Sequence, residues 1–192
     1  RRGNFMGTWD QVLCNALREE FDADVSLSAG VRWGTTTLKG DWITMEDVMT
    51  QCSMTYGETY VSEMTGHDLM NIIEQVADNL FDPDPYLQSG GDMVRIGGLD
   101  YTIDPSQKLY ERITNARLDN GHLIEADKTY KVAGWASVGK APEGRLMWDV
   151  VRDYIVKNKG KDNVLTLKKI NHPELKGVLD NPGIADYPGK AS

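Results

Sequence analysis

DVSLSAGVRWG, residues 24–34, is the stretch around which the rest of the chain can be arranged. Val25 and Leu27 alternate as in a short buried strand, which breaks at the small residues 29 and 30. Arg32 then follows at the carboxyl end of this strand, where open α/β sheets bind ligands. Because a guanidinium binds tetrahedral oxyanions through paired donors, we predict an oxyanion-binding loop around Arg32. The alternative is a surface arginine that closes a turn.

The length and the net charge of the chain indicate which kinds of protein it can be. The chain has 192 residues, which fits one domain with or without a tail. Its 21 basic and 29 acidic residues give a net charge of −8, which disfavours non-specific binding to nucleic acid. No apolar run is long enough to span a bilayer, so we expect no membrane partner. Because the chain begins at Arg1 without a methionine or a signal peptide, we expect a fragment of a longer or processed protein.

Helices and strands alternate in the first half of the chain. Apolar residues at helical spacing predict a helix over residues 7–21. Thr44, followed three residues later by Asp47, predicts the start of a short helix. Alternation over residues 56–64 predicts a strand, and the clearest amphipathic stripe of the chain follows it until Pro83.

The second half is predicted to be richer in strands. Residues 109–118 are expected to pair with residues 130–135 around the turn at residues 119–122, whose Asn-Gly pair favours a hairpin. A helix is predicted near residues 146–155 and a final strand over residues 164–170. The sum is an α/β chain of the mixed α+β class, with a mixed sheet flanked by helices.

Clusters of reactive side chains are missing from the sequence. The three histidines have no metal-ligand spacing to one another, to a cysteine or to a carboxylate pair. Residues 134–140 have the spacing of a P-loop up to its lysine, but Ala141 stands where a serine or threonine is needed. Cys14 and Cys52 lie in apolar helical patterns and are predicted to be buried free thiols. We therefore predict no catalytic residue and no metal ligand in this chain.

Four side chains on predicted loops suit ligand binding instead. Arg32 follows the first strand, Tyr56 precedes the second, Trp135 ends a later strand, and Glu143 lies in the loop after it. Two aromatic rings and an arginine from different loops could enclose a planar or extended ligand beside an anion. The alternatives are core or rim packing for the two aromatic residues and a solvated surface position for Glu143.

Motifs in a fixed order give the chain a family resemblance. Over about residues 3–158 it resembles the C-terminal domain of the 5'-nucleotidase family, through AGVR (29–32), MTYG (54–57), IGGLDY (96–101) and DKTYKV (127–132). Within this family, GGDMVRIGGL (90–99) is most similar to the SoxB branch, the thiosulfohydrolases of bacterial sulfur oxidation. The resemblance implies a 5'-nucleotidase-type substrate-binding domain over residues 1–158. Residues 159–192 would add a final strand and a tail that packs on it.

The resemblance also implies a longer parent enzyme. Its N-terminal metallophosphatase-like domain, absent from this chain, would hold two manganese ions, and this domain would bind no cofactor. The parent would be periplasmic and would hydrolyse the S-thiosulfonate on the cysteine of the SoxYZ carrier, releasing sulfate. The isolated domain would be inactive, and its partners would be the carrier and its own N-terminal domain.

Site residues follow from the resemblance position by position. Arg32 matches an arginine that contacts the substrate, and Arg2 lies where a second substrate arginine can occur. Tyr56 and Trp135 match the aromatic pair that encloses a nucleobase in nucleotidases. Glu143 falls where an acidic residue contacts the ribose.

Departures from the nucleotidase pattern favour a different substrate. Leu27 and Ser28 replace the expected asparagine pair, Ala29 replaces a glycine, and residues 141–144 replace a Gly-Gly-Asp-Gly run. These changes remove polar contacts to a nucleoside but keep Arg32 and the two aromatic residues. A periplasmic 5'-nucleotidase and a module that only docks the carrier remain the alternatives.

Overall fold

The computed structural model describes residues 5–30, 36–52, 56–90, 92–137 and 144–176. Helices and strands alternate up to the third helix and four consecutive strands then follow, which confirms the mixed α+β class. In chain order they are α1 (Thr8–Phe21), β1 (Val25–Ser28), α2 (Met45–Gln51), β2 (Thr59–Thr65), α3 (Gly66–Phe81), β3 (Arg95–Gly97), β4 (Leu99–Ile103), β5 (Ile113–Leu118), β6 (Thr129–Trp135), α4 (Met147–Asn158) and β7 (Glu174–Leu175).

Two sheets form from these strands. The four-stranded sheet has the order β2-β6-β1-β3, in which β1 runs parallel to β6 and the other neighbours are antiparallel. The three-stranded sheet has the order β5-β4-β7. The parallel pair β1–β6 places the carboxyl ends of both strands at one edge, next to the loop predicted to hold an oxyanion.

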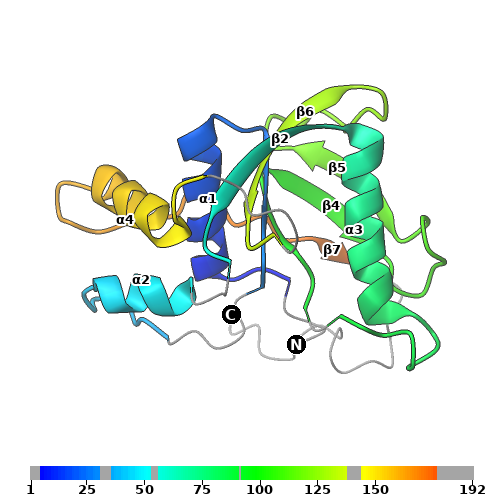
Figure 1. Cartoon of the computed structure of the whole chain (residues 1–192), viewed down its shortest axis with the longest axis horizontal. Helices are drawn as coiled ribbons and strands as arrows, with labels where there is room; N and C mark the ends of the chain where they lie inside the picture. Colours follow the sequence, from blue (N-terminus) through cyan, green and yellow to red (C-terminus); the bar gives the residue numbers. More distant parts are fainter. Residues whose placement is uncertain (1–4, 31–35, 53–55, 91, 138–143, 177–192) are drawn as a thin grey trace.

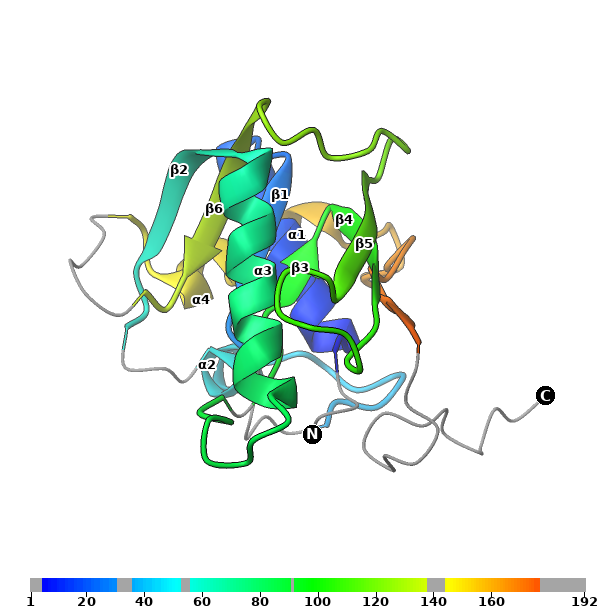
Figure 2. The ribbon, with the colours of Figure 1, turned by 90° about the vertical axis from the view of Figure 1, so that its right-hand side faces the viewer.

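The four-stranded sheet separates two hydrophobic cores. Val25 and Leu27 of β1 pack with α3 and the second sheet, whereas Ala133 and Trp135 of β6 pack with α1, α2 and α4. Figure 1 shows the resulting layers, with α1, α2 and α4 on one side and α3 on the other. Figure 2 looks onto α3, behind which the strands of both sheets lie. Because successive side chains of a strand face opposite ways, β6 supplies both cores.

Local sequence signals set the predicted helix starts. The backbone N–H of Thr44 donates to Asp47 Oδ2 at 2.8 Å, and the backbone N–H of Asp47 donates to Thr44 Oγ1 at 3.2 Å. This reciprocal pair satisfies two of the amide groups that a helix start leaves open. Thr65 caps α3 in a similar way, by accepting from the backbone N–H of Asp68 at 3.1 Å.

The predicted hairpin between residues 109–118 and 130–135 is wrong. The turn itself forms, since Leu118 N–H donates to the carbonyl of His122 at 2.9 Å and Gly121 adopts a φ of 86°. However, β5 pairs with β4, and β6 lies between β1 and β2. The reason is burial: β6 carries apolar side chains for both cores and needs a central place, whereas β5 exposes half of its side chains.

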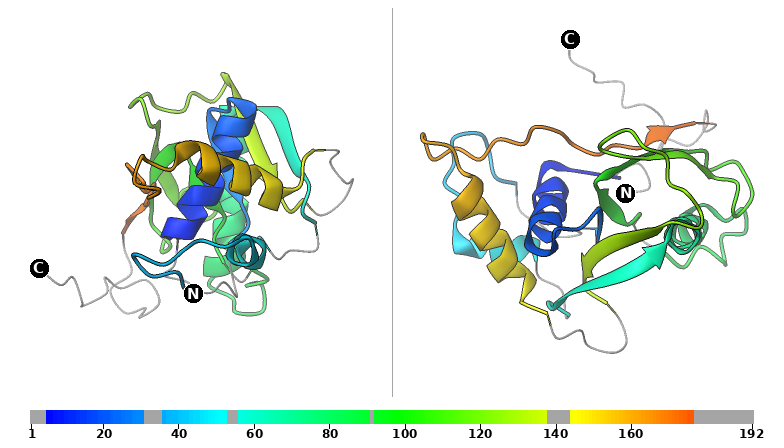
Figure 3. Two further views of the ribbon diagram at one scale, coloured as in Figure 1. Left: turned by 90° about the vertical axis from the view of Figure 1, so that its left-hand side faces the viewer. Right: turned by 90° about the horizontal axis from the view of Figure 1, so that it is seen from above.

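The final strand is also shorter and later than predicted. Residues 164–170 are irregular, and Glu174–Leu175 forms β7, parallel to β4. Figure 3 shows the segment after α4 running back across the molecule to β7. Asn171, 3% exposed, anchors this segment by accepting from Gly98 N–H at 3.0 Å and donating to Asp119 at 2.9 Å. Polar contacts with distant loops therefore place the segment that follows residue 164.

Candidate functional site

Three of the five predicted site residues lie outside the described parts of the chain. These are Arg2, Arg32 and Glu143. Their predicted roles remain predictions. The described residues at the same edge of the sheet are therefore the ones from which the site can be built.

The carboxyl ends of β1 and β6 are joined by a side-chain hydrogen bond. Their parallel register sets Leu27 beside Gly134. One residue further on each strand, Trp135 Nε1–H donates to Ser28 Oγ at 2.7 Å. Ser28 stands where the nucleotidase pattern has an asparagine, so this departure has a structural use. It gives a buried indole N–H its acceptor.

Trp135 packs into the core, which is the alternative that the sequence left open for it. Only 4% of its surface is exposed, and it lies in the hydrophobic cluster formed with α1, α2 and α4. Tyr56, by contrast, is 42% exposed just before β2. Of the two predicted aromatic residues, Tyr56 presents an open surface and Trp135 forms part of the floor beneath the edge.

The segment that carries Tyr56 is held firmly by α4. The backbone N–H of Met147 donates to the carbonyl of Gly57 at 2.7 Å. A β-carbon on Gly57 would lie 2.5 Å from the ring of Trp148. Since only glycine allows so close an approach, the position after Tyr56 is fixed by packing against α4.

A buried ion pair beside the carboxyl end of β1 was not assigned from the sequence. Arg95 is 0% exposed and pairs with Asp10, with 3.2 Å between Nε and Oδ2. A β-carbon on Gly30 would lie 3.2 Å from Arg95 Nη2. The signal that could have found it is an arginine in the otherwise apolar run Met93–Gly97.

An exposed apolar stripe, defined here as Trp42, Met45 and Met49, lies on α2 and on the segment just before it. Met45 and Met49 are four positions apart and share one face of the helix, while Trp42 precedes the cap residue Thr44. Trp42, Met45 and Met49 are 82%, 38% and 50% exposed, while Val48 on the opposite face is buried. Exposed apolar surfaces of this kind are typical of sites that bind another surface.

Metal or nucleophilic chemistry finds no support in the described residues. In these parts of the chain, no three His, Cys, Asp or Glu side chains are arranged to hold a metal ion. Burial raises the pKa of Cys14 and of Cys52 to about 12, so neither thiol supplies a thiolate at neutral pH. The described helices also include none with the length and apolar character needed to cross a bilayer.

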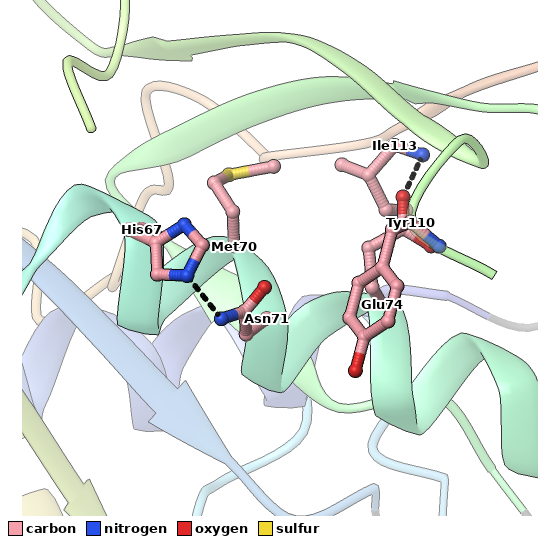
Figure 4. Close-up of a pocket in the computed structure, with 6 residues that line it drawn as sticks. All are labelled: His67, Met70, Asn71, Glu74, Tyr110 and Ile113. Atoms are coloured by element: carbon pink, nitrogen blue, oxygen red, sulfur yellow. Dashed lines mark hydrogen bonds between the residues drawn. The ribbon is translucent and has the colours of Figure 1, made fainter.

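A pocket of about 540 Å³ lies along α3, and Figure 4 shows six residues that line it. Its carboxylate, Glu74, already accepts from the backbone N–H groups of Tyr110 at 3.1 Å and Ile113 at 2.6 Å. His67 is paired with Asn71 at 2.9 Å. Because these polar groups serve the structure and none of the predicted site residues is among the six, we do not assign the site to this pocket.

A family comparison matches most of the chain. The sequence fits the family described as 5'-nucleotidase, C-terminal domain, over residues 7–148. A comparison with curated protein sequences finds no match.

Solved structures of two kinds resemble the chain. The sulfate thiohydrolase SoxB of Thermus thermophilus is 29% identical over 88% of the chain, with a TM-score of 0.77. A putative 5'-nucleotidase of Staphylococcus aureus is 18% identical over 87% of the chain with a TM-score of 0.67. A 5'-nucleotidase precursor of Thermus thermophilus is 14% identical over 95% with a TM-score of 0.68. The chain spans 32%, 36% and 38% of these proteins, about a third of their length.

Proposed function

The chain belongs to the 5'-nucleotidase C-terminal domain family, and we propose that it is the substrate-binding part of a longer hydrolase. Hydrolases are the named relatives, and the chain corresponds to about a third of each. The reactive clusters missing from the described residues would then belong to another part of the parent protein. The two manganese ions and the periplasmic location are part of the same proposal.

We further propose that the parent is a thiosulfohydrolase acting on a carrier-bound thiosulfonate. The observation that carries this choice is the 29% identity to SoxB over 88% of the chain. The two nucleotidases, at 18% and 14% identity, support the fold alone. In the proposed reaction the oxygen of a water molecule bonds to the terminal sulfonate sulfur and the sulfur–sulfur bond to that group breaks. The electron pair of the broken bond stays with the inner sulfur, which remains on the carrier cysteine as a persulfide, while sulfate and the protons of the water are released.

Surface chemistry supports a protein-borne substrate. Trp42, Met45 and Met49 form an exposed apolar stripe, and such surfaces often mark sites that bind another protein. Tryptophan and methionine are enriched in protein–protein interfaces. We propose that the body of the SoxYZ carrier covers this stripe while its cysteine arm passes Tyr56 toward the loop.

Each site residue has a proposed role. Arg32 would bind the sulfonate through paired donors, with Arg2 as a second cationic contact. Tyr56 would guide the arm, and Glu143 would line its path. Trp135 would support the edge from within the core, in place of the open stacking surface predicted from the sequence.

One experiment separates the two enzyme classes. The full-length protein, loaded with manganese, is offered thiosulfonated SoxYZ carrier and adenosine monophosphate side by side, and sulfate and phosphate are both assayed. We expect sulfate alone, and no turnover by the isolated chain at any manganese concentration. Phosphate alone would refute the thiosulfohydrolase proposal in favour of a nucleotidase.

Arg32→Ala tests the role of the loop within the same assay. We expect a loss of transition-state stabilisation of roughly 2–5 kcal/mol, since one partner of a charge pair is removed. Unchanged kcat and KM on the carrier would exclude Arg32 from the site. A change in carrier binding with unchanged kcat would favour a module that only docks the carrier.

A further inference from the structure

Arg95 is a buried arginine for which the proposed substrate contacts have no use. It begins β3 and stands opposite Ser28 in the antiparallel pair β1–β3. Ser28 is the last residue of β1, so Arg95 lies at the edge from which residues 29 and 30 leave the sheet. Its exposed fraction is 0%.

Among the described residues, Asp10 and the backbone of Met93 help to orient the guanidinium. Arg95 Nε lies 3.2 Å from Asp10 Oδ2, and Arg95 Nη1–H donates to the carbonyl of Met93 at 3.0 Å. The same Asp10 oxygen accepts from the backbone N–H of Gly7 at 2.9 Å. Since Gly7 caps α1, Arg95 is tied to the start of that helix as well as to its own strand.

Gly30 rests directly on this guanidinium. A β-carbon there would lie 3.2 Å from Arg95 Nη2, 3.3 Å from Arg95 Cζ and 3.0 Å from the β-carbon of Asp92. Gly30 is not among the glycines with positive φ. The close approach of its backbone to Arg95, rather than a left-handed conformation, therefore explains why glycine stands here.

Stability alone is a weak reason for such a pair. Burying two charges costs about as much desolvation energy as their attraction returns, and apolar residues of similar volume often replace buried ion pairs without loss. Arginine has a rigid, planar head group with a fixed donor geometry. A planar guanidinium in a fixed orientation can hold a backbone segment that packs on it in one position.

We propose that Arg95 is a positioning residue for the substrate loop. Its guanidinium, oriented by Asp10, supports the backbone of Gly30, the last described residue before the loop predicted to bind the oxyanion. This inference rests on the proposed function of that loop as the oxyanion-binding segment. Arg95 itself would not touch the substrate.

The test compares kinetic constants in the full-length protein. Arg95→Lys keeps the charge but removes the planar head group, and Asp10→Asn weakens its orientation. We expect kcat/KM on the thiosulfonated carrier to fall roughly ten- to hundredfold in both variants, mainly through KM, because a displaced loop binds the substrate poorly. Hydrogen exchange of the backbone amides of Ala29 and Gly30 should rise in both.

Arg112→Lys is the matched control. Arg112 is another buried arginine, with 3% of its surface exposed. Its Nη1 lies 2.5 Å from Asp78 Oδ1, and this pair joins the residue just before β5 to α3. We expect Arg112→Lys to lower the melting temperature as Arg95→Lys does, while KM and the exchange at residues 29 and 30 stay unchanged. The double variant Gly30→Ala, Arg95→Lys should cost less than the product of the two single effects, because both act on one contact.

The outcomes separate this inference from the proposed function. The inference fails if Arg95→Lys and Asp10→Asn lower the melting temperature as Arg112→Lys does but leave KM and the exchange at residues 29 and 30 unchanged. Arg95 would then have only a structural role, as one partner of a buried ion pair. If the unmodified protein releases phosphate from adenosine monophosphate instead of sulfate, the thiosulfohydrolase proposal fails. The same comparison of KM on the nucleotide then still tests Arg95.

Discussion

A single hydrogen bond decides how Trp135 is used. Its indole N–H is buried, and Ser28 Oγ, 2.7 Å away, is its acceptor. A buried donor without an acceptor costs the full desolvation of that group, whereas removing both partners together can be nearly neutral. The pair therefore gives a test of Trp135 as a structural support for the edge of the sheet.

Ser28→Ala should lower the free energy of unfolding by about 1–3 kcal/mol, measured by urea titration. Ser28→Ala combined with Trp135→Phe is the control, because phenylalanine has no N–H to satisfy. We expect the double variant to be less destabilised than the sum of its two single variants. Additive losses would show that the hydrogen bond is not what holds the indole.

Among the helices, α2 has two apolar faces with different purposes. Val48 is buried against the core, while Met45 and Met49 of the helix, and Trp42 just before it, are exposed. Removing exposed side chains leaves the core unchanged, so their loss can affect binding without unfolding the protein. This makes the stripe testable by kinetics.

Replacing Trp42 and Met49 together by alanine should raise KM for the carrier about 5- to 30-fold with kcat unchanged, since interface anchors typically contribute 1–2 kcal/mol. Steady-state sulfate release by the full-length protein measures this. Val156→Ala, an exposed apolar residue on α4, should leave KM unchanged. An unchanged KM in the double variant, or a loss of protein stability instead, would mean that the stripe packs against another part of the parent protein.

Across the whole molecule, a polar clamp fastens the segment after α4 to the turn beyond β5. Lys169 and Asn171 on this segment each donate hydrogen bonds to Asp100 and Asp119. Arg18 also donates to Asp119, and these five residues form the clamp. Burial would raise the pKa of Asp119, but hydrogen bonds from Lys169, Asn171 and Arg18 outweigh it and hold the pKa below its ordinary value of 3.8. The ionised carboxylate is therefore the form that fastens the segment.

Acid should loosen this clamp. A carboxyl group whose pKa is lower in the folded state stabilises it above its ordinary pKa, and this contribution is lost as the pH falls through the folded-state value. We expect the protection of residues 169–176 from hydrogen exchange, taken relative to the intrinsic exchange rate at each pH, to be high at pH 7 and to fall below about pH 4. Asp119→Asn should lower this protection already at pH 7 and flatten its dependence on pH. The same acid dependence in Asp119→Asn would assign the effect to other carboxylates.

The sequence by itself determined two kinds of feature: local structure, such as helix starts and strands, and the family, through the order of its motifs. Helix starts at Thr44 and Thr65 follow from neighbours three residues away, and the strand at Val25 follows from alternation. The family followed from short motifs that keep their order along most of the chain. Such features need no knowledge of distant contacts, which is why a single sequence contains them.

Only the tertiary structure decided which strands pair and which side chains are buried. β6 pairs with β1 and β2 instead of with β5, its predicted partner, because its apolar side chains contribute to both hydrophobic cores. Trp135 became core and Tyr56 stayed exposed for the same reason, since α1, α2 and α4 cover one and not the other. Arg95 was unassigned until Asp10 and Gly30, 85 and 65 positions away in the sequence, were seen to meet it. Burial depends on what the rest of the chain places over a residue, and no local pattern contains that information.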